Sequence, residues 1–271
     1  MLLLAGLAGS CVDMRVDHAR RIADDIAEAA GFSARLIETP QFTLLSYQRF
    51  APREGSVLDV YIEGDGLAWI NRTQISDDPT PSDPLALRMA AADDAPNVLY
   101  LARPCQFVAA SNDHCDPKYW AESRYAPEIV EATNNAVDQA LARSDAHRVE
   151  LVGYSGGGVL AALVAARRND VVRVITVGAN LDLPFWTNEK HVSPLSGSLS
   201  PTDERTALGR IPQVMFVGGR DDIVPPSVAN HYRAALPVGA PAIIVTISEF
   251  SHTCCWATAW PDLIRRARSL P

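Results

Sequence analysis

The sequence has no excess of positive charge. Lysine and arginine total 24 and aspartate and glutamate total 32, so the 271-residue chain carries a formal net charge of −8. A protein that binds nucleic acid through its phosphates needs a basic stripe or patch. The charge balance therefore argues against nucleic acid as the main partner and leaves small neutral substrates open.

Long apolar runs and paired metal-binding cysteines are also missing. The apolar stretch that begins at Met1 is too short to span a bilayer. The five cysteines include no Cys-x-x-Cys pair, so we expect no metal site. The chain has no internal repeat and no long polar linker, and its length is near the upper limit for one hydrophobic core. We expect a single domain over residues 12–271.

Secondary-structure patterns alternate between strand-like and helix-like along most of the chain. The expected strands are 42–50, 57–62, 97–102, 149–152, 171–177, 213–217 and 242–247, and the expected helices are 16–30, 85–92, 128–141, 159–168, 227–236 and 254–268. This alternation predicts an α/β fold, with a mostly parallel sheet covered on both faces. Residues 71–84 read as a surface loop, and residues 180–206 as a cap-like excursion over the top of the sheet.

A serine lies in a glycine-rich turn at the end of one expected strand. The pentapeptide 153–157 reads Gly-Tyr-Ser-Gly-Gly and fits Gly-x-Ser-x-Gly, with an apolar strand before it and a helix after it. In that context the serine hydroxyl projects above the carboxyl edge of the sheet, where ligands bind in such folds. Ser155 is therefore the candidate nucleophile. The alternative is a structural βα turn with an idle serine.

A serine hydroxyl needs a base to take its proton, and His252 is the best placed of the six histidines. It follows the expected strand 242–247 and precedes the last helix. His231 falls inside an expected helix and His147 precedes the Ser155 strand. His114 and His191 lie in irregular segments, where either would be able to line a pocket.

The acid that orients the histidine is expected after the strand 213–217. The segment 218–225 reads Gly-Gly-Arg-Asp-Asp-Ile-Val-Pro and resembles the acid turn of α/β-hydrolases, Gly-x-x-Asp-x-x-Val-Pro. Alignment on the Val-Pro pair implies Asp221 as the acid, with Asp222 as the alternative. The order Ser155, Asp221, His252 is also the order of the triad in that superfamily. The resemblance covers residues 40–268 and implies the α/β-hydrolase fold; within the superfamily the chain resembles bacterial hydrolases labelled putative lipoproteins.

The same resemblance implies where an oxyanion would bind. One donor is the backbone N–H of Gly156, the residue after the nucleophile, and the other comes from the loop after an early strand. By position that second donor is the N–H of Asp65. Many relatives have His-Gly where this chain has Glu63-Gly64, so the side chain of the acid must point away from the oxyanion. The alternative is a plain Gly-Asp-Gly turn.

These residues together predict a serine hydrolase that cleaves an acyl ester or another acyl substrate, with no metal or organic cofactor. A thioester, an amide or acyl transfer to another acceptor stays open. The competing hypothesis is a non-catalytic, envelope-associated binding protein that retains the fold. The complete triad order argues against it, because a binding protein does not need all three groups.

The N-terminal residues resemble the end of a bacterial lipoprotein signal. Residues 7–10, Leu-Ala-Gly-Ser, are followed by Cys11. The resemblance implies that residues 1–11 are a signal remnant and that Cys11 is lipidated, which would attach an exported protein to the membrane. No basic residue lies between Met1 and Cys11, so we expect a longer signal. The alternative is a frayed apolar N-terminus.

Cys105 and Cys115 lie ten residues apart in an irregular segment. A disulfide between them would close a short loop and suits an oxidising compartment such as the periplasm. The segment follows the expected strand 97–102, so we expect the loop to shape the mouth of the site, with Phe107, His114 and Trp120 near the substrate. The alternative is two reduced thiols.

Overall fold

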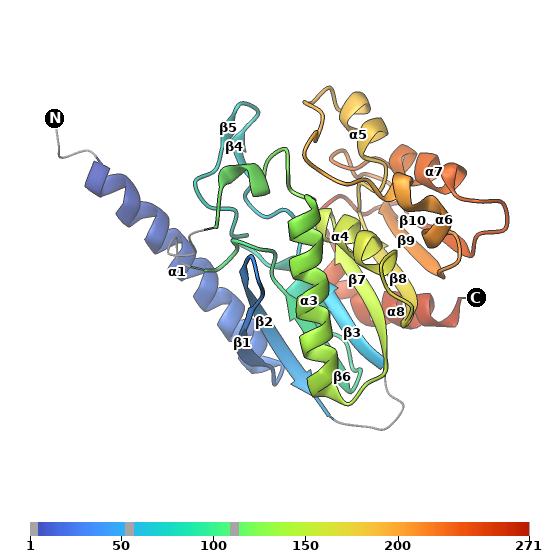
Figure 1. Ribbon diagram of the computed structural model, residues 1–271, viewed down its shortest axis with the longest axis horizontal. Coiled ribbons are helices and arrows are strands. Elements are labelled where there is room, and N and C mark those ends of the chain that lie inside the picture. Colours follow the sequence, from blue (N-terminus) through green and yellow to red (C-terminus); the bar gives the residue numbers. More distant parts are fainter. Residues whose placement is uncertain (1–4, 52–56, 109–113, 271) are drawn as a thin grey trace.

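The computed structural model describes residues 5–51, 57–108 and 114–270. Within these residues an eight-stranded sheet has the order β1-β2-β6-β3-β7-β8-β9-β10 (Figure 1). Its strands are β1 (Ser33–Glu38), β2 (Thr43–Phe50), β3 (Val57–Ile62), β6 (Asn97–Leu101), β7 (Arg148–Tyr154), β8 (Val171–Val177), β9 (Gln213–Gly218) and β10 (Ala242–Ile247). β2 is antiparallel to β1 and β6, and the pairings from β6 through to β10 are parallel.

Alternating side chains of each strand enter two separate cores. In β3, Leu58 and Val60 pack on one face of the sheet and Tyr61 packs on the other. The first core lies under α3 (Pro127–Ser144) and α4 (Gly156–Ala165), and the second under α1 (Ala5–Ala29), α2 (Leu85–Ala91) and α8 (Trp256–Ser269). Figure 1 shows α3 and α4 in front of the sheet and α8 behind it. Burial on both faces explains why the parallel strands are nearly continuous in apolar residues.

The N-terminal helix packs on the sheet through alanines. Ala19, Ala23 and Ala27 are buried one turn apart, whereas the larger Ile22 and Ile26 are half-buried. Short side chains let a helix approach its neighbours closely. In the described part of the chain, no helix is both long enough and apolar enough to cross a membrane.

The backbone of α1 begins at Ala5, well before the residue expected from the sequence. Residues 1–4 and the side chain of Cys11 lie outside what the structure describes. The expected signal remnant and the lipidation of Cys11 therefore stay predictions.

Several elements were not expected from the sequence. The edge strand β1 buries only Ile37 of its six residues, so it has no hydrophobic alternation to indicate a strand. A hairpin of β4 (Trp69–Asn71) and β5 (Gln74–Ile75) extends into the expected surface loop. The segment expected to be irregular contains α5 (Leu183–Glu189), whose first turn is capped by the Asp182 carboxylate.

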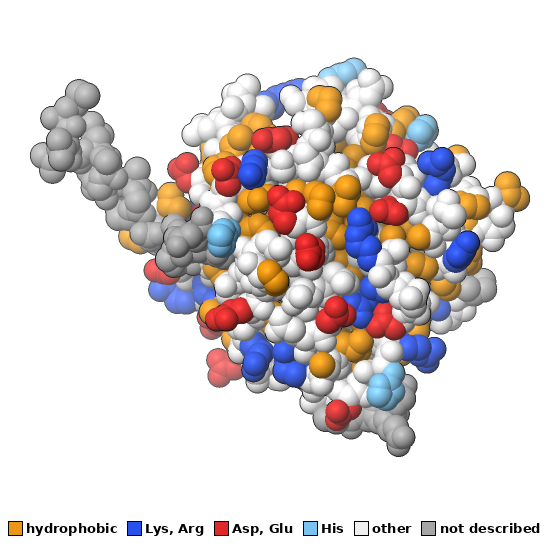
Figure 2. Space-filling view, viewed as in Figure 1, with side chains coloured by type: hydrophobic (Ala, Val, Ile, Leu, Met, Phe, Trp, Pro, Cys, Tyr) orange, Lys and Arg blue, Asp and Glu red, His pale blue; other side chains and the backbone are white. Residues whose placement is uncertain are grey.

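Four further short elements lie outside the sheet. They are η1 (Pro117–Tyr119), η2 (Pro201–Glu204), α6 (Arg205–Leu208) and α7 (Pro226–Ala235). Figure 1 places β4, β5 and α5 at the top of the view, beyond the carboxyl ends of the parallel strands. On the face seen in Figure 2, hydrophobic side chains gather around the upper end of α3, and acidic and basic side chains are interspersed around them.

Candidate active site

Ser155 occupies a sharp turn between β7 and α4. Its backbone has φ 50° and ψ −123°, a conformation that costs a non-glycine residue about 1–3 kcal/mol. Its N–H donates to the Val177 carbonyl at 2.8 Å, which helps to hold the turn. A Cβ at Gly153 would collide with the backbone of Gly157, and one at Gly157 with the carbonyl of Ile62. The two glycines are therefore required by the close approach of helix and strand.

The structure brings the three expected triad residues into one chain of hydrogen bonds. His252 Nε2 lies 3.0 Å from Ser155 Oγ, and His252 Nδ1 lies 2.8 Å from Asp221 Oδ2. The backbone of His252 is also held in place, because its carbonyl accepts hydrogen bonds from Trp256 Nε1 and the Tyr154 hydroxyl. With Nδ1–H directed at the carboxylate, Nε2 is free to accept the serine proton.

The two adjacent aspartates have different surroundings. The Asp221 side chain is fully buried, and its Oδ1 accepts hydrogen bonds from the N–H groups of Ile223 and Val224 at 3.0 and 2.8 Å. Asp222 is exposed, and its carboxylate has no hydrogen-bond partner in the described part of the chain. Its backbone carbonyl accepts a hydrogen bond from the Lys190 ammonium. The geometry thus assigns the histidine contact to Asp221, as the alignment on Val-Pro suggested.

The other histidines lie away from Ser155. His231 stacks on Phe185 and bonds to the Asp182 carboxylate at 2.6 Å on the outside of α7. His191 lines cavities next to α5 but not the one beside Ser155, and His114 is exposed. These positions leave His252 as the histidine that reaches the nucleophile among the described residues.

The two residues that carry the expected oxyanion donors are in contact with each other. Gly156 is the first residue of α4, where backbone N–H groups have no partner within the helix. Asp65 follows β3 and lies against Gly156, so that a Cβ at position 156 would collide with the Asp65 carboxylate. The turn that carries Asp65 therefore packs directly against the first residue of α4.

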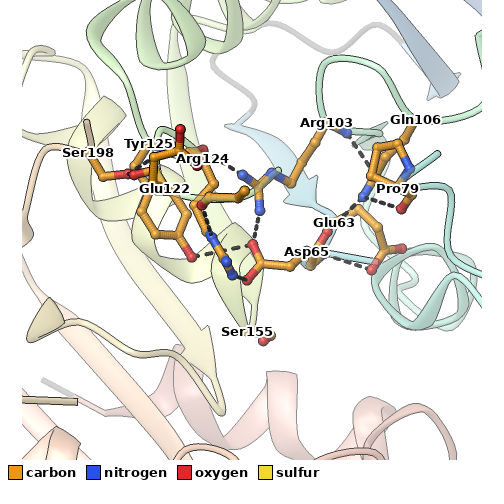
Figure 3. Close-up of polar contacts among 12 residues, drawn as sticks. Glu63, Asp65, Pro79, Arg103, Gln106, Glu122, Arg124, Tyr125, Ser155 and Ser198 are labelled. Carbon is orange, nitrogen blue, oxygen red and sulfur yellow. Dashed lines mark hydrogen bonds and ion pairs between the residues drawn. The ribbon is translucent and has the colours of Figure 1, made fainter. Parts of the chain in front are cut away.

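The Asp65 carboxylate is held by an ionic cluster that the sequence did not indicate. Arg103 bonds to Oδ1, Arg124 bonds to Oδ2 at 2.7 Å, and the Tyr125 hydroxyl donates to Oδ1 at 3.3 Å. Figure 3 shows the two guanidinium groups converging on Asp65, with Ser155 below them. Burial would raise the pKa of Asp65, but the two arginines outweigh it and lower the pKa below the ordinary value. The cluster contains two guanidinium groups and one carboxylate, so it is net positive.

Glu63 stands where many relatives have a histidine, and its side chain points away from Ser155. Its Oε1 accepts hydrogen bonds from the N–H groups of Gly64 and Ala86, and its Oε2 accepts one from the Tyr100 hydroxyl. Burial raises the pKa of Glu63 to about 7, although these hydrogen bonds lower it. The Glu63 carboxylate therefore stabilises the turn through hydrogen bonds, and it does not point toward Ser155.

A cavity of about 640 Å³ opens beside Ser155 and His252. Its size falls within the range of small-molecule sites. One wall is apolar, and the polar groups that face it include Asp83, Arg124 and Asn180; the apolar lining residues are Leu67, Ala68, Trp69, Pro81, Trp186, Ile223 and Val224. Trp69 comes from β4 and Trp186 from α5, two of the elements that the sequence did not predict. Among the described residues, no cluster of histidine, cysteine, aspartate and glutamate could hold a metal ion.

Comparisons with known proteins find similarity in structure and none in sequence. No family model matches the chain, and no curated protein matches it in sequence. The acylaminoacyl peptidase of Pyrococcus horikoshii matches with a TM-score of 0.62 and 12% identity, over 87% of this chain; the chain spans 40% of the peptidase. Est1E from Butyrivibrio proteoclasticus matches with a TM-score of 0.59 and 13% identity, over 87% of this chain and 99% of Est1E.

A third solved structure, an alpha-beta serine hydrolase homologue from Coxiella burnetii, matches with a TM-score of 0.59 and 17% identity, over 88% of this chain and 97% of the homologue. The chain has the α/β-hydrolase fold. The fold class expected from the sequence is confirmed. At such low identities the similarity establishes the fold alone, and the activity has to be argued from the site.

The described residues around Cys105 and Cys115 do not line the cavity beside Ser155. Cys105 and Cys115 are joined, with their Cα atoms 5.6 Å apart. Phe107 and Trp120 are buried, and neither they nor His114 line the cavity beside Ser155. The expectation that these three residues lie near the substrate is therefore wrong. The loop influences the site instead through Arg103 and Gln106, on either side of Cys105, which contact the turn at Gly64 and Asp65.

Sequence reasoning missed Arg103, Gln106, Arg124 and Tyr125. One signal was present for Arg103, because a charged residue directly after a buried strand lies at the edge of the sheet where ligands bind. No pattern marks the others, since their partners are distant in the chain.

Proposed function

We propose that this chain is a serine hydrolase that cleaves a carboxylic ester through an acyl-enzyme. The observation that carries the proposal is the continuous series of hydrogen bonds from Asp221 through His252 to Ser155, beside a cavity large enough for a small molecule. The strained backbone of Ser155 is a second support, because such strain persists where the surrounding structure enforces it.

In the proposed reaction, Ser155 Oγ attacks the ester carbonyl carbon while His252 Nε2 takes the hydroxyl proton. Asp221 keeps the imidazole in the required tautomer and stabilises its charged form. The carbonyl oxygen becomes an oxyanion, and the N–H groups of Gly156 and Asp65 stabilise it. His252 then gives the proton to the leaving alcohol, and a water molecule, activated by the same imidazole, releases the acid from Ser155.

The apolar wall of the cavity supports an uncharged acyl or alcohol group as part of the substrate. Trp69, Trp186 and Ile223 would contact it, and all three come from segments outside the sheet. The fold by itself does not choose between an ester and an amide, because solved structures that share it include an acylaminoacyl peptidase and a putative lipase from Acinetobacter baumannii. The ester is proposed because an alcohol is a better leaving group than an amine.

A fluorophosphonate probe and a series of p-nitrophenyl esters of increasing acyl length test the proposal. We expect the wild type to be labelled and to hydrolyse esters, and Ser155→Ala to do neither. Ser33→Ala, which changes an exposed serine on the edge strand β1, is the matched control and should behave as the wild type. Folded wild-type protein that is neither labelled nor active would favour the non-catalytic binding protein.

The proposed location rests on the sequence resemblance at Cys11. If that cysteine is lipidated, the native-length precursor is found in the membrane fraction, and Cys11→Ser prevents its processing or releases it. Unmodified native protein in the cytoplasm would contradict the proposal.

A further inference from the structure

The peptide group between Gly64 and Asp65 is bonded at its carbonyl and open at its N–H. The Gly64 carbonyl accepts a hydrogen bond from Gln106 Nε2 at 2.9 Å, and the Gly64 N–H donates to the Glu63 carboxylate at 2.9 Å. Over residues 5–51, 57–108 and 114–270, no acceptor in the protein bonds to the Asp65 N–H. That N–H is therefore available to a ligand.

The bond from Gln106 fixes the direction of the Asp65 N–H. In a planar trans peptide, the carbonyl and the following N–H point in opposite directions. Gln106 is 1% exposed and lies behind the turn, where a Cβ at Gly66 would meet its amide and the Pro79 carbonyl. The Asp65 N–H is consequently directed to the other side of the turn, away from Gln106. Figure 3 shows Ser155 on the opposite side of Asp65 from Gln106.

The amide of Gln106 is itself oriented by its neighbours. Its Oε1 accepts a hydrogen bond from the Arg103 N–H at 3.1 Å, so its Nε2 faces the carbonyls of Gly64 and Pro79. Both contacts suit the donor and acceptor ends of a primary amide. A side chain without an N–H at this position would leave the Gly64 carbonyl free to rotate.

Arg103 restrains the same turn through the side chain of Asp65. Its guanidinium bonds to the Asp65 carboxylate and donates to the Arg124 carbonyl at 2.6 Å, and it lies over the Tyr125 ring. Arg103 is buried and does not line the cavity beside Ser155, so it acts through Asp65 without touching a substrate. A rotation of the peptide would have to break this ion pair as well as the bond to Gln106.

We propose that Gln106 and Arg103 are positioning residues of the oxyanion hole, which aim the Asp65 N–H at the oxyanion formed on Ser155. The inference rests on the proposed serine hydrolase function. It explains how a turn that has Glu63-Gly64 in place of His-Gly can present a donor: the loop after β6 holds the turn from behind. The same loop carries Cys105, between the two positioning residues.

The test replaces Gln106 by methionine, which has a similar length and no N–H. We expect Gln106→Met to lower kcat for a p-nitrophenyl ester by about 100-fold. The affinity for an alkylboronic acid, which forms a tetrahedral adduct with serine, should fall by a similar factor. KM should change less than about threefold, since the oxyanion forms after binding. Rates are expressed per site labelled by the fluorophosphonate probe, so that a partly unfolded sample does not affect the comparison.

Gln213→Met is the matched control. Gln213 is also buried, and its Nε2 also donates to a backbone carbonyl, that of Leu208 at 2.8 Å, but it lies at the opposite end of β9 from the site. The control should lose stability and keep the kcat and boronate affinity of the wild type. If Gln106→Met does not fold, Arg103→Lys, which keeps the charge and loses the forked contact, gives the same comparison.

Two results would overturn the inference. The first is that Gln106→Met keeps the kcat and the boronate affinity of the wild type per labelled site. Where Gln106→Met does not fold, the same result in Arg103→Lys overturns the inference. The second is an equal loss in Gln213→Met, which would show a general effect of stability. A wild type that hydrolyses no ester and is not labelled would instead contradict the proposed function itself, so the two failures are distinguishable.

Discussion

The carboxylate of Asp65 occupies the space that a side chain at Gly156 would need. The Tyr125 hydroxyl closes the same space, and Arg103 and Arg124 prevent the carboxylate from moving aside. The residue after Ser155 is therefore glycine for a reason specific to this chain. The Asp65 carboxylate, held by two arginines, therefore packs directly against the backbone of Gly156.

Gly156→Ala should therefore impair the reaction. The added methyl group would push Asp65 away and displace its N–H, and we expect kcat to fall by about 100-fold with little change in KM. Gly239→Ala is the control: its φ of 83° makes alanine strained, at a cost of about 1 kcal/mol, but no atom lies near the added methyl group. Equal activity of the two variants in the p-nitrophenyl ester assay would contradict the role of Gly156.

Ser155→Ala and His252→Ala should each lower kcat by roughly 10⁴- to 10⁶-fold. Their effects should not add, because either change removes the same attacking group. Measuring the double variant against both single variants checks this. A double variant that is slower by the product of the two factors would indicate that the residues act independently.

Asp221→Asn should reduce kcat by about 10⁴-fold, because an amide stabilises the wrong tautomer of His252. Asp222→Asn should stay within about twofold of the wild type, since its carboxylate is exposed and contacts no part of the triad. The pair is matched in chemistry and separated by one residue. Comparable losses in both variants would overturn the assignment of Asp221.

Glu63 should make stability depend on pH near neutrality. Its pKa is about 7 in the folded protein, where burial raises it, and 4.5 ordinarily. Between pH 4.5 and pH 7 the folded state binds a proton at Glu63 that the unfolded state has released. The stability contributed by protonated Glu63 is therefore complete below about pH 4.5 and is lost as the pH rises through about 7. The loss amounts to about 3 kcal/mol.

Glu63→Gln removes this titration. The free energy of unfolding of the variant and the wild type is measured by denaturant at pH 5 and pH 8.5. The difference between them should shift in favour of the variant by about 2.5 kcal/mol at the higher pH, because part of the loss lies below pH 5. A difference that is the same at both pH values would show that Glu63 titrates in its ordinary range.

The bond between Cys105 and Cys115 should stabilise protein made in an oxidising compartment by about 2–3 kcal/mol, as the chain-entropy model gives for a ten-residue separation. Peptide mapping without reductant should recover the two cysteines in one linked fragment. A reductant should lower the unfolding temperature of the wild type and leave that of the Cys105→Ser/Cys115→Ser double variant unchanged. The double variant keeps Cys254 and Cys255, so it controls for any effect of the reductant on that adjacent pair. Two free thiols in the map would contradict the prediction.

Elements with a strong local pattern were predicted well from the sequence. The central strands β6, β3, β7 and β9 are apolar runs because they are buried on both faces, and the edge strand β10 is an apolar run that is buried in part. β1 and the β4–β5 hairpin were missed for the opposite reason: their residues are mostly exposed, so they carry no hydrophobic period.

The sequence by itself determined that Asp221 and His252 would lie next to Ser155. Parallel strands end at one edge of the sheet, so a serine, an aspartate and a histidine that each follow a strand are brought together by topology alone. Only the tertiary structure decided what supports the proposed oxyanion hole. Arg103 and Arg124 lie 38 and 59 residues from Asp65, and the loops that carry them have no period or motif that predicts their path. Their contacts depend on packing over the completed sheet, which no local pattern records.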